Sequence, residues 1–231
     1  MKSTKLFFDI ESGPQPDAYL SLVLPPFNPD DVKLGNIKDP EKIAAKIEEA
    51  RCNHFANFKA NAALDAKYGK VMAIGWCNED GWLDVLHGDE IEILSEFFGV
   101  LDEYQSGFIY GYNIKGFDLP FLFQRAWILG LPTPRNLRTF RGGRVYWADS
   151  VIDLMEAWTM GRDFKGQSLD AVARALGVGF KNGHGARFAE LYETDQPAAL
   201  EYLKNDVQLT DRKSTRLNSS HVSESRMPSS A

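Results

Sequence analysis

Residues 5–14 read KLFFDIESGP, and this stretch places two carboxylates at the end of an apolar run. The run Leu6–Phe8 predicts a buried strand, in which side chains alternate between the two faces of a sheet. Phe7, Asp9 and Glu11 therefore share one face. Two neighbouring carboxylates at the edge of a core repel each other and lose hydration, so we expect a positive charge to hold them. The alternative is a strand end that simply reaches solvent.

The composition is that of an ordinary globular domain. The chain has 231 residues, of which 44% are hydrophobic and 25% are charged. No apolar run approaches the roughly 20 residues of a membrane-spanning helix, and the start of the chain lacks the features of a signal peptide. Cys52 and Cys77 lie far apart, which indicates neither a disulfide framework nor a zinc site. We therefore predict a cytoplasmic protein with no membrane association.

Charge is distributed unevenly along the chain. The net charge is −6, but residues 212–231 carry four basic side chains and one acid, which leaves −9 for the residues before them. A protein with this charge would bind nucleic acid only through a local basic patch and metal ions. Residues 212–231 are rich in serine and resemble translated sequencing-adapter read-through. We predict a disordered, non-native tail there, with the last helix cut short near Asp211.

The order of expected elements favours a single α/β domain over residues 1–211. After the first strand, residues 12–67 are polar and contain helical spacing, and we predict them to be an insertion in that domain. The remaining chain reads as a hairpin, helix, strand, helix, strand and three helices, which is typical of a mixed sheet with helices on its faces. The last of these strands is expected at 144–150, with a helix from Val151.

Three further residues, Asp118, Tyr202 and Asp206, are candidates for the same site as Asp9 and Glu11. Asp118 lies where an expected strand gives way to a helix, although an aspartate near a helix N-terminus also suits capping. Tyr202 and Asp206 are four residues apart and so share one helix face, although an amphipathic helix would also account for them. A second Asp-x-Glu pair, Asp39 and Glu41, is interpreted as the exposed start of a helix.

Together, FFDIE, NIKGFDLPFL and YLKNDVQLT resemble, in this order, the three motifs of the DEDD 3'–5' exonucleases. The Tyr-x3-Asp form of the third motif resembles the tyrosine branch, and the chain from Lys5 to Asp211 is similar to the exonuclease domain of family B DNA polymerases. The resemblance implies a ribonuclease H-like fold, with a mixed central sheet flanked by helices.

Four converging carboxylates are tolerable only around divalent cations, and oxygen ligands suit Mg²⁺ or Mn²⁺. The resemblance implies two ions per site and hydrolysis of phosphodiester bonds by in-line displacement. By the family pattern, Asp9 would bridge both ions, Glu11 and Asp206 would complete the first, and Asp118 would support the second. Tyr202 would orient the attacking water, since its reference pKa of about 10 makes it a poor base.

Contacts to a nucleic-acid strand are expected from basic and aromatic side chains. Arg141 and Arg144 lie in a loop with interleaved aromatic residues, which would track phosphates while bases stack. A solvated basic loop over core aromatics explains this loop equally well. Lys165 precedes an expected helix N-terminus, and the family pattern places Asn113 in the cleft. Phe117 is a further predicted contact to the strand.

These observations predict a metal-dependent 3'–5' exonuclease that acts on the 3' ends of single-stranded DNA. It would stand alone or work beside a separate replication or repair protein. An RNA-directed exonuclease and a catalytically silent nucleic-acid-binding module of the same fold remain alternatives. A phosphatase with an aspartyl nucleophile is less consistent, because its common fold requires Asp-x-Asp where this chain has Asp-Ile-Glu.

Overall fold

The structure is a computed structural model that describes residues 4–104, 106–141, 144–161, 167–180 and 187–218. Its residues separate into two compact units. The smaller unit is residues 13–70, close to the predicted insertion at 12–67, and the larger unit holds residues 1–12 and 71–231. In the part of the chain just given, no helix is both long and apolar enough to cross a bilayer.

The larger unit is built on a five-stranded mixed sheet, which confirms the predicted α/β class. Its strand order is β3-β2-β1-β4-β7, in which β1, β4 and β7 are parallel while β2 and β3 form an antiparallel hairpin. The strands are β1 Lys5–Pro14, β2 Gly69–Asn78, β3 Leu83–His87, β4 Phe108–Gly111 and β7 Val151–Asp153. A separate antiparallel hairpin comprises β5 Arg138–Arg141 and β6 Arg144–Trp147.

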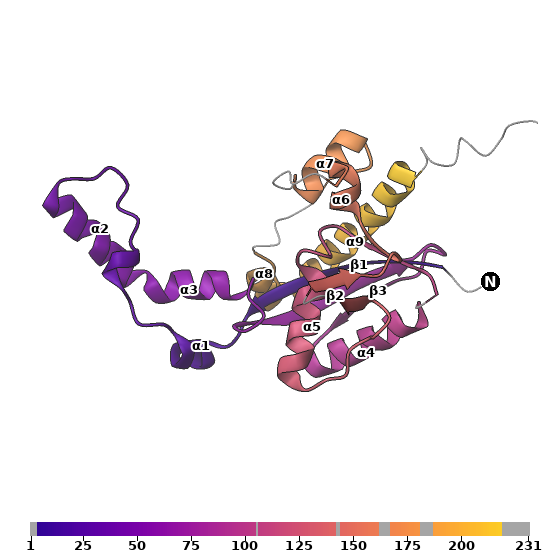
Figure 1. The fold of residues 1–231 in the computed structure, drawn as a ribbon, viewed down its shortest axis with the longest axis horizontal. Helices are drawn as coiled ribbons and strands as arrows, with labels where there is room; N and C mark the ends of the chain where they lie inside the picture. The colour runs from indigo at the N-terminus through magenta and orange to yellow at the C-terminus, as the bar shows by residue number, and fades with distance from the viewer. Residues whose placement is uncertain (1–3, 105, 142–143, 162–166, 181–186, 219–231) are drawn as a thin grey trace, which may run out of the picture. The chain divides into compact units, whose positions relative to one another are not determined.

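Helices cover both faces of this sheet (Figure 1). On one face lie α4 Glu90–Glu103 and α5 Asp118–Leu129, and Phe8 of β1 packs there against Phe97, with ring centroids 5.0 Å apart. The other face carries α6 Leu154–Thr159, α7 Leu169–Leu176, α8 Phe188–Thr194 and α9 Gln196–Asn218. Because side chains alternate along β1, Phe7 points to this second face and joins the core cluster that includes Leu203 of α9.

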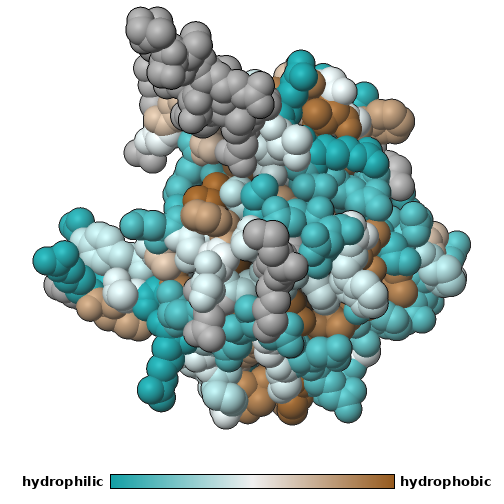
Figure 2. All heavy atoms as spheres, turned by 90° about the vertical axis from the view of Figure 1, so that its right-hand side faces the viewer, coloured by the Kyte–Doolittle hydropathy of each residue, from teal (hydrophilic) through white to brown (hydrophobic). Residues whose placement is uncertain are grey.

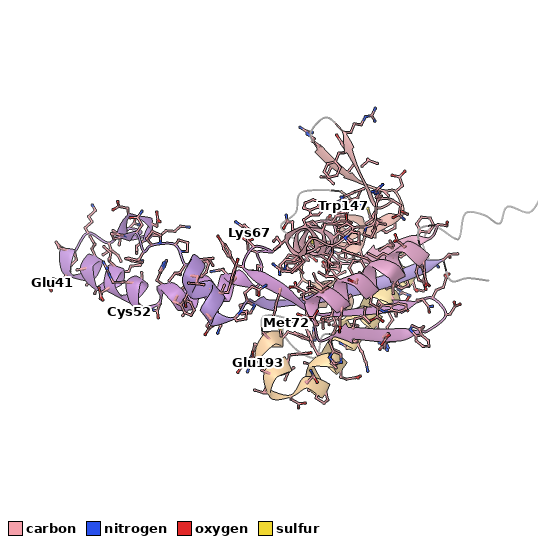
Figure 3. The ribbon with its side chains drawn as sticks, turned by 90° about the horizontal axis from the view of Figure 1, so that it is seen from below. Glu41, Cys52, Lys67, Met72, Trp147 and Glu193 are labelled. Carbon is pink, nitrogen blue, oxygen red and sulfur yellow. The ribbon has the colours of Figure 1, made fainter. Side chains whose placement is uncertain are left out.

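A glycine in β2 allows α9 to pack directly on the sheet. A Cβ atom at Gly75 would lie 2.8 Å from both Leu203 Cγ and Val207 Cγ2. The same core cluster extends to Met72 of β2 and Phe188 of α8, and Figure 3 shows Met72 near the helix that carries Glu193. The close approach brings the inner face of α9 against β1 and β2.

The smaller unit is helical. It contains α1 Asp17–Val23, a short 3-10 helix at Pro29–Asp31, α2 Pro40–Cys52 and α3 His54–Ala62. Figure 3 labels Glu41 and Cys52 near the two ends of α2. Asp39 caps α2 by accepting a hydrogen bond from the Glu41 backbone N–H at 3.0 Å. This contact confirms that the second Asp-x-Glu pair is a helix start.

Two predicted elements differ from the structure. The strand expected at 144–150 is β6 of the separate hairpin, and the edge of the sheet is instead β7, where a helix was expected from Val151. The helix α9 continues to Asn218, whereas a disordered tail was predicted from residue 212. That prediction is wrong for residues 212–218, because Lys213 and Ser214 are buried and Lys213 Nζ donates to the Leu169 carbonyl at 2.5 Å. Residues 219–231 lie outside the described residues.

Candidate metal centre

Three carboxylates from β1 and α9 lie together on the second face of the sheet. Oxygen atoms of Asp9, Glu11 and Asp206 all lie within 4.8 Å of one another. The strand alternation that turns Phe7 toward α9 turns Asp9 and Glu11 the same way. Asp206 is fully buried, with an exposed fraction of 0%, and Glu11 is 7% exposed. The predicted pairing of this strand with the last helix is therefore present in the fold.

Tyr202 lies one turn before Asp206 on the same side of α9. Its ring is 4% exposed and belongs to the core cluster with Phe7, and its centroid lies 6.4 Å from that of Phe188. The four-residue spacing projects both side chains toward β1. The ring thus holds the start of this turn in the core, while Asp206 extends to the carboxylate cluster.

Asp118 adjoins this cluster beside Asp9. It is the first residue of α5, it is 3% exposed, and its Oδ1 accepts a hydrogen bond from the Ile10 backbone N–H at 3.2 Å. Burial raises the pKa of the Asp118 carboxyl well above its ordinary value, and the charges of Asp9 and Asp153 raise it further. Hydrogen bonds from the backbone N–H groups of Ile10 and Asp118 itself act in the opposite direction. Asp118 therefore resists ionisation until a positive charge is nearby.

A cleft of about 480 Å³ opens beside these carboxylates. Asp9 and Asp118 form part of its wall, and the predicted strand-binding residues Asn113 and Phe117 line it as well. The other lining residues come from β1, the loop after β4, α6, the start of α7 and the two residues before α7: Ile10, Tyr112, Met155, Leu169, Gln167 and Ser168. The cleft places polar and aromatic groups next to the acidic cluster.

The remaining predicted strand contacts lie elsewhere. Arg141 of β5 pairs with Arg144 of β6, both side chains are exposed, and neither lines the cleft. Phe140 and Tyr146 of the same hairpin are also exposed. Lys165 falls outside the described residues. On the face drawn in Figure 2, hydrophobic residues are scattered among hydrophilic ones.

The wall formed by Gln167, Ser168 and Leu169 was missed by sequence reasoning. Tyr112 donates a hydrogen bond to the Gln167 carbonyl at 2.5 Å, and Trp158 Nε1 donates to the Gln167 side-chain oxygen at 3.1 Å. Ser168 caps α7 through the Ala171 backbone N–H. The sequence signal here was only that of a capped helix, and nothing local in it indicates which groove that helix borders.

The donor set fits a hard divalent cation. Oxygens on opposite sides of Mg²⁺ lie about 4 Å apart, because each metal–oxygen distance is about 2.0–2.1 Å. The 4.8 Å limit of the Asp9, Glu11 and Asp206 oxygens is close to this span, so small side-chain movements would bring all three to one ion. Carboxylate oxygens are also the ligands preferred by Mg²⁺ and Mn²⁺. The residues present therefore fit the predicted cofactor class.

Comparisons with known proteins agree with the motifs. Residues 44–153 match the family model described as DNA polymerase family B, exonuclease domain; they include Asp118 but exclude β1 and α9. A DNA polymerase of Archaeoglobus fulgidus is 36% identical over 99 residues, which are 41% of this chain and 13% of that protein. The DNA polymerase catalytic subunit of Saimiriine herpesvirus 2 is 35% identical over 65 residues, 28% of this chain and 6% of that protein.

A solved structure shows the same fold. The family B DNA polymerase from the archaeon Pyrobaculum calidifontis matches 96% of this chain with a TM-score of 0.59 at 20% sequence identity. The match covers 25% of the polymerase chain, so this chain spans a small part of the length of each of these relatives. The central sheet with its flanking helices is thus the exonuclease fold expected from the sequence. The chain is therefore similar in sequence and in fold to the exonuclease domain of family B DNA polymerases, the family that its three motifs resemble.

Proposed function

We propose that this protein is a metal-dependent 3'–5' exonuclease that hydrolyses phosphodiester bonds at the 3' ends of single-stranded DNA. The observation that supports this most directly is the cluster of Asp9, Glu11 and Asp206 beside a cleft that Asp118 also lines. Acids from positions this far apart in the chain converge where a strand would enter. Without a cation, such a cluster would be destabilised by repulsion and lost hydration.

Each acidic side chain has a distinct role in this proposal. Two bound Mg²⁺ or Mn²⁺ ions would stabilise the attacking and leaving oxygens and lower the pKa of a bound water. Asp9, Glu11 and Asp206 would hold the first ion, while Asp9 and Asp118 would hold the second. The Tyr202 hydroxyl orients the attacking water. It is a poor general base, since the ordinary pKa of a tyrosine is about 10.

Strand binding is divided between the cleft and the hairpin. Asn113 and Phe117 line the cleft, where the amide would hydrogen-bond the terminal nucleotide and the ring would stack on its base. Arg141 and Arg144 on the exposed β5–β6 hairpin would contact phosphates further along the strand. Lys165 is proposed as a further phosphate contact. These local contacts are consistent with a net charge of −6, which gives no general attraction to nucleic acid.

The proposed setting is DNA replication or repair. The chain covers 25% of the polymerase to which its fold is similar, and the proposal concerns the nuclease step that the described residues would perform. A replication or repair protein is its proposed partner.

The test is degradation of single-stranded DNA and RNA labelled at the 5' end, with Mg²⁺, Mn²⁺ or a chelator. We expect DNA to shorten stepwise from its 3' end, and we expect the chelator to stop the reaction. Asp206→Ala should lower the rate by more than about 100-fold, because it removes a metal ligand outright. Tyr202→Phe should lower the rate by less than about 100-fold, which is the smallest loss expected when a general base is removed.

The outcomes separate the alternatives. Equal degradation by wild type and Asp206→Ala would indicate a contaminating nuclease and contradict the proposed site. Binding of the strand without cleavage would favour the catalytically silent module. Faster shortening of RNA than of DNA would reassign the substrate and leave the site in place.

A further inference from the structure

Asp153 is a buried carboxylate that the proposed chemistry does not use. It ends β7 and caps α6, and its exposed fraction is 3%. Its Oδ1 accepts hydrogen bonds from the backbone N–H groups of Asn113 at 2.8 Å and Met155 at 2.9 Å. Its Oδ2 accepts one from the Lys115 backbone N–H at 3.1 Å. One side chain thus binds its own helix and also the loop between β4 and α5.

That loop, residues 112–117, connects the end of β4 with Asp118. Asn113 adopts a left-handed backbone conformation with φ of 64°, which non-glycine residues rarely adopt unless their surroundings hold them in it. A Cβ atom at Gly116 would lie 2.4 Å from Asn113 Oδ1, so the loop folds tightly on itself. The Gly116 N–H donates to the Asn113 carbonyl at 3.0 Å, and both N–H groups bound by Asp153 belong to this turn.

The position of Asp153 in the sheet makes this contact direct. Asp153 pairs in register with Gly111, the last residue of β4, so the two neighbouring parallel strands end side by side. The loop that leaves β4 therefore passes over the end of β7. Lys115 Nζ also pairs with Glu156 Oε2 of α6 at 2.8 Å, but Glu156 is half-exposed and surface pairs of this kind contribute little.

Asp153 is unsuited to binding a metal ion in this arrangement. Both of its oxygens are occupied by backbone donors on two different elements, and they point into the loop. Its influence on the cleft passes through the residues that the loop carries. Asn113 lines the cleft directly, and Asp118 follows the loop immediately.

We propose that Asp153 is a positioning residue that fixes the β4–α5 loop, so that Asn113 faces the strand and Asp118 faces Asp9. The proposal rests on the proposed nuclease function and deepens it. When the loop is released, Asp118 loses its fixed place beside Asp9, and the second metal ion is held more weakly. The cluster of Asp9, Glu11 and Asp206 lies on other elements and would still hold the first ion.

The test compares Asp153→Ala and Asp153→Asn with wild type and with Asp118→Asn. Asparagine keeps the shape but offers a single oxygen to the three backbone donors. Asp89→Ala is the matched control, because Asp89 caps α4 through two backbone N–H groups and does not line the cleft. Bound Mn²⁺ is counted by electron paramagnetic resonance without DNA, and kcat and KM are measured at several Mn²⁺ concentrations.

We expect the Asp153 variants to keep one tightly bound Mn²⁺ and to bind the second roughly 10–100-fold more weakly, as loss of a group that orients a ligand does. Asp89→Ala should lower thermal stability while Mn²⁺ binding stays at the wild-type level. The double variant Asp153→Ala with Asp118→Asn should bind Mn²⁺ no more weakly than Asp118→Asn alone, because both changes remove the same ligand from its place.

Two failures are distinguishable. Wild-type protein that binds no Mn²⁺ and cuts no strand would overturn the proposed function. Wild-type protein that binds two ions and cuts, while every folded Asp153 variant binds both ions equally well, would overturn only the role of Asp153. If Asp153→Ala fails to fold, Asp153→Asn decides between these outcomes.

Discussion

Asp118 is a residue whose ionisation opposes the folding of the metal-free protein. Its pKa is raised first by burial and then by the charge of Asp9. A carboxyl whose pKa is raised on folding contributes stability that is full below its ordinary value of about 3.9 and is lost as the pH rises through the raised value. Asp118→Asn keeps an oxygen for the Ile10 N–H and has no charge to desolvate.

We therefore expect Asp118→Asn to unfold at a higher temperature than wild type at pH 7 in chelator. For a protein of this size, each kcal/mol of difference in the free energy of unfolding shifts the melting temperature by about 2–4 °C. The difference should vanish near pH 3, where both side chains are neutral, and reverse in saturating Mg²⁺, which stabilises only the protein that binds it well. Thermal melts followed by circular dichroism measure this. A variant less stable than wild type in chelator at pH 7 would contradict it.

At the scale of elements, the approach of α9 to β2 controls whether Asp206 reaches β1. Gly75→Ala places a methyl group 2.8 Å from Leu203 and Val207. We expect the helix to move outward. Overpacking should lower the free energy of unfolding by about 1–3 kcal/mol, and the displaced Asp206 should weaken Mn²⁺ binding. Urea unfolding and Mn²⁺ titration measure the two effects.

The matched control is Gly99→Ala in α4, where an added Cβ meets nothing within 4 Å. Alanine is favoured over glycine in a helix by roughly 0.5–1 kcal/mol, so this variant should be more stable with unchanged Mn²⁺ binding. If Gly75→Ala bound Mn²⁺ as tightly as wild type, the contact of Gly75 with α9 would not control the distance between α9 and β2.

Elements with a clear period were predictable from the sequence. The alternation in residues 5–14 indicated which residues share a face, and the four-residue spacing of Tyr202 and Asp206 indicated a common side of a helix. The three-residue strand β7 was missed, since Val151–Asp153 is too short for a period and runs directly into a helix. The role of Asp153 was not predicted either, because its partners Asn113 and Lys115 lie about 40 residues earlier in the chain.

At the scale of the whole molecule, residues 212–218 belong to the fold although their sequence resembles a tail. Their apolar content is low, so sequence pattern alone predicts no burial, yet α9 continues and buries Lys213 and Ser214. Only the assembled structure shows that Leu169, at the cleft wall, is the acceptor for Lys213 Nζ. Such long-range contacts have no local signature.

We expect a chain that ends at Asp211 to be less stable than a chain that ends at Asn218. The shorter chain loses the Lys213 hydrogen bond and leaves the Leu169 carbonyl without it, at a cost of about 1–3 kcal/mol. Urea unfolding of the two truncated chains measures the difference. Equal stability would mean that the last turns of α9 contribute nothing to the cleft wall.

The location of Asp206 on α9 has a consequence for synthesis of the protein. The cluster needs both β1 and α9, which lie far apart in the chain, so a nascent chain on the ribosome holds no complete set of ligands until α9 has emerged. The proposed hydrolysis therefore cannot begin before α9 has been synthesised, and incomplete products that end before α9 would be inert toward the cell's own DNA.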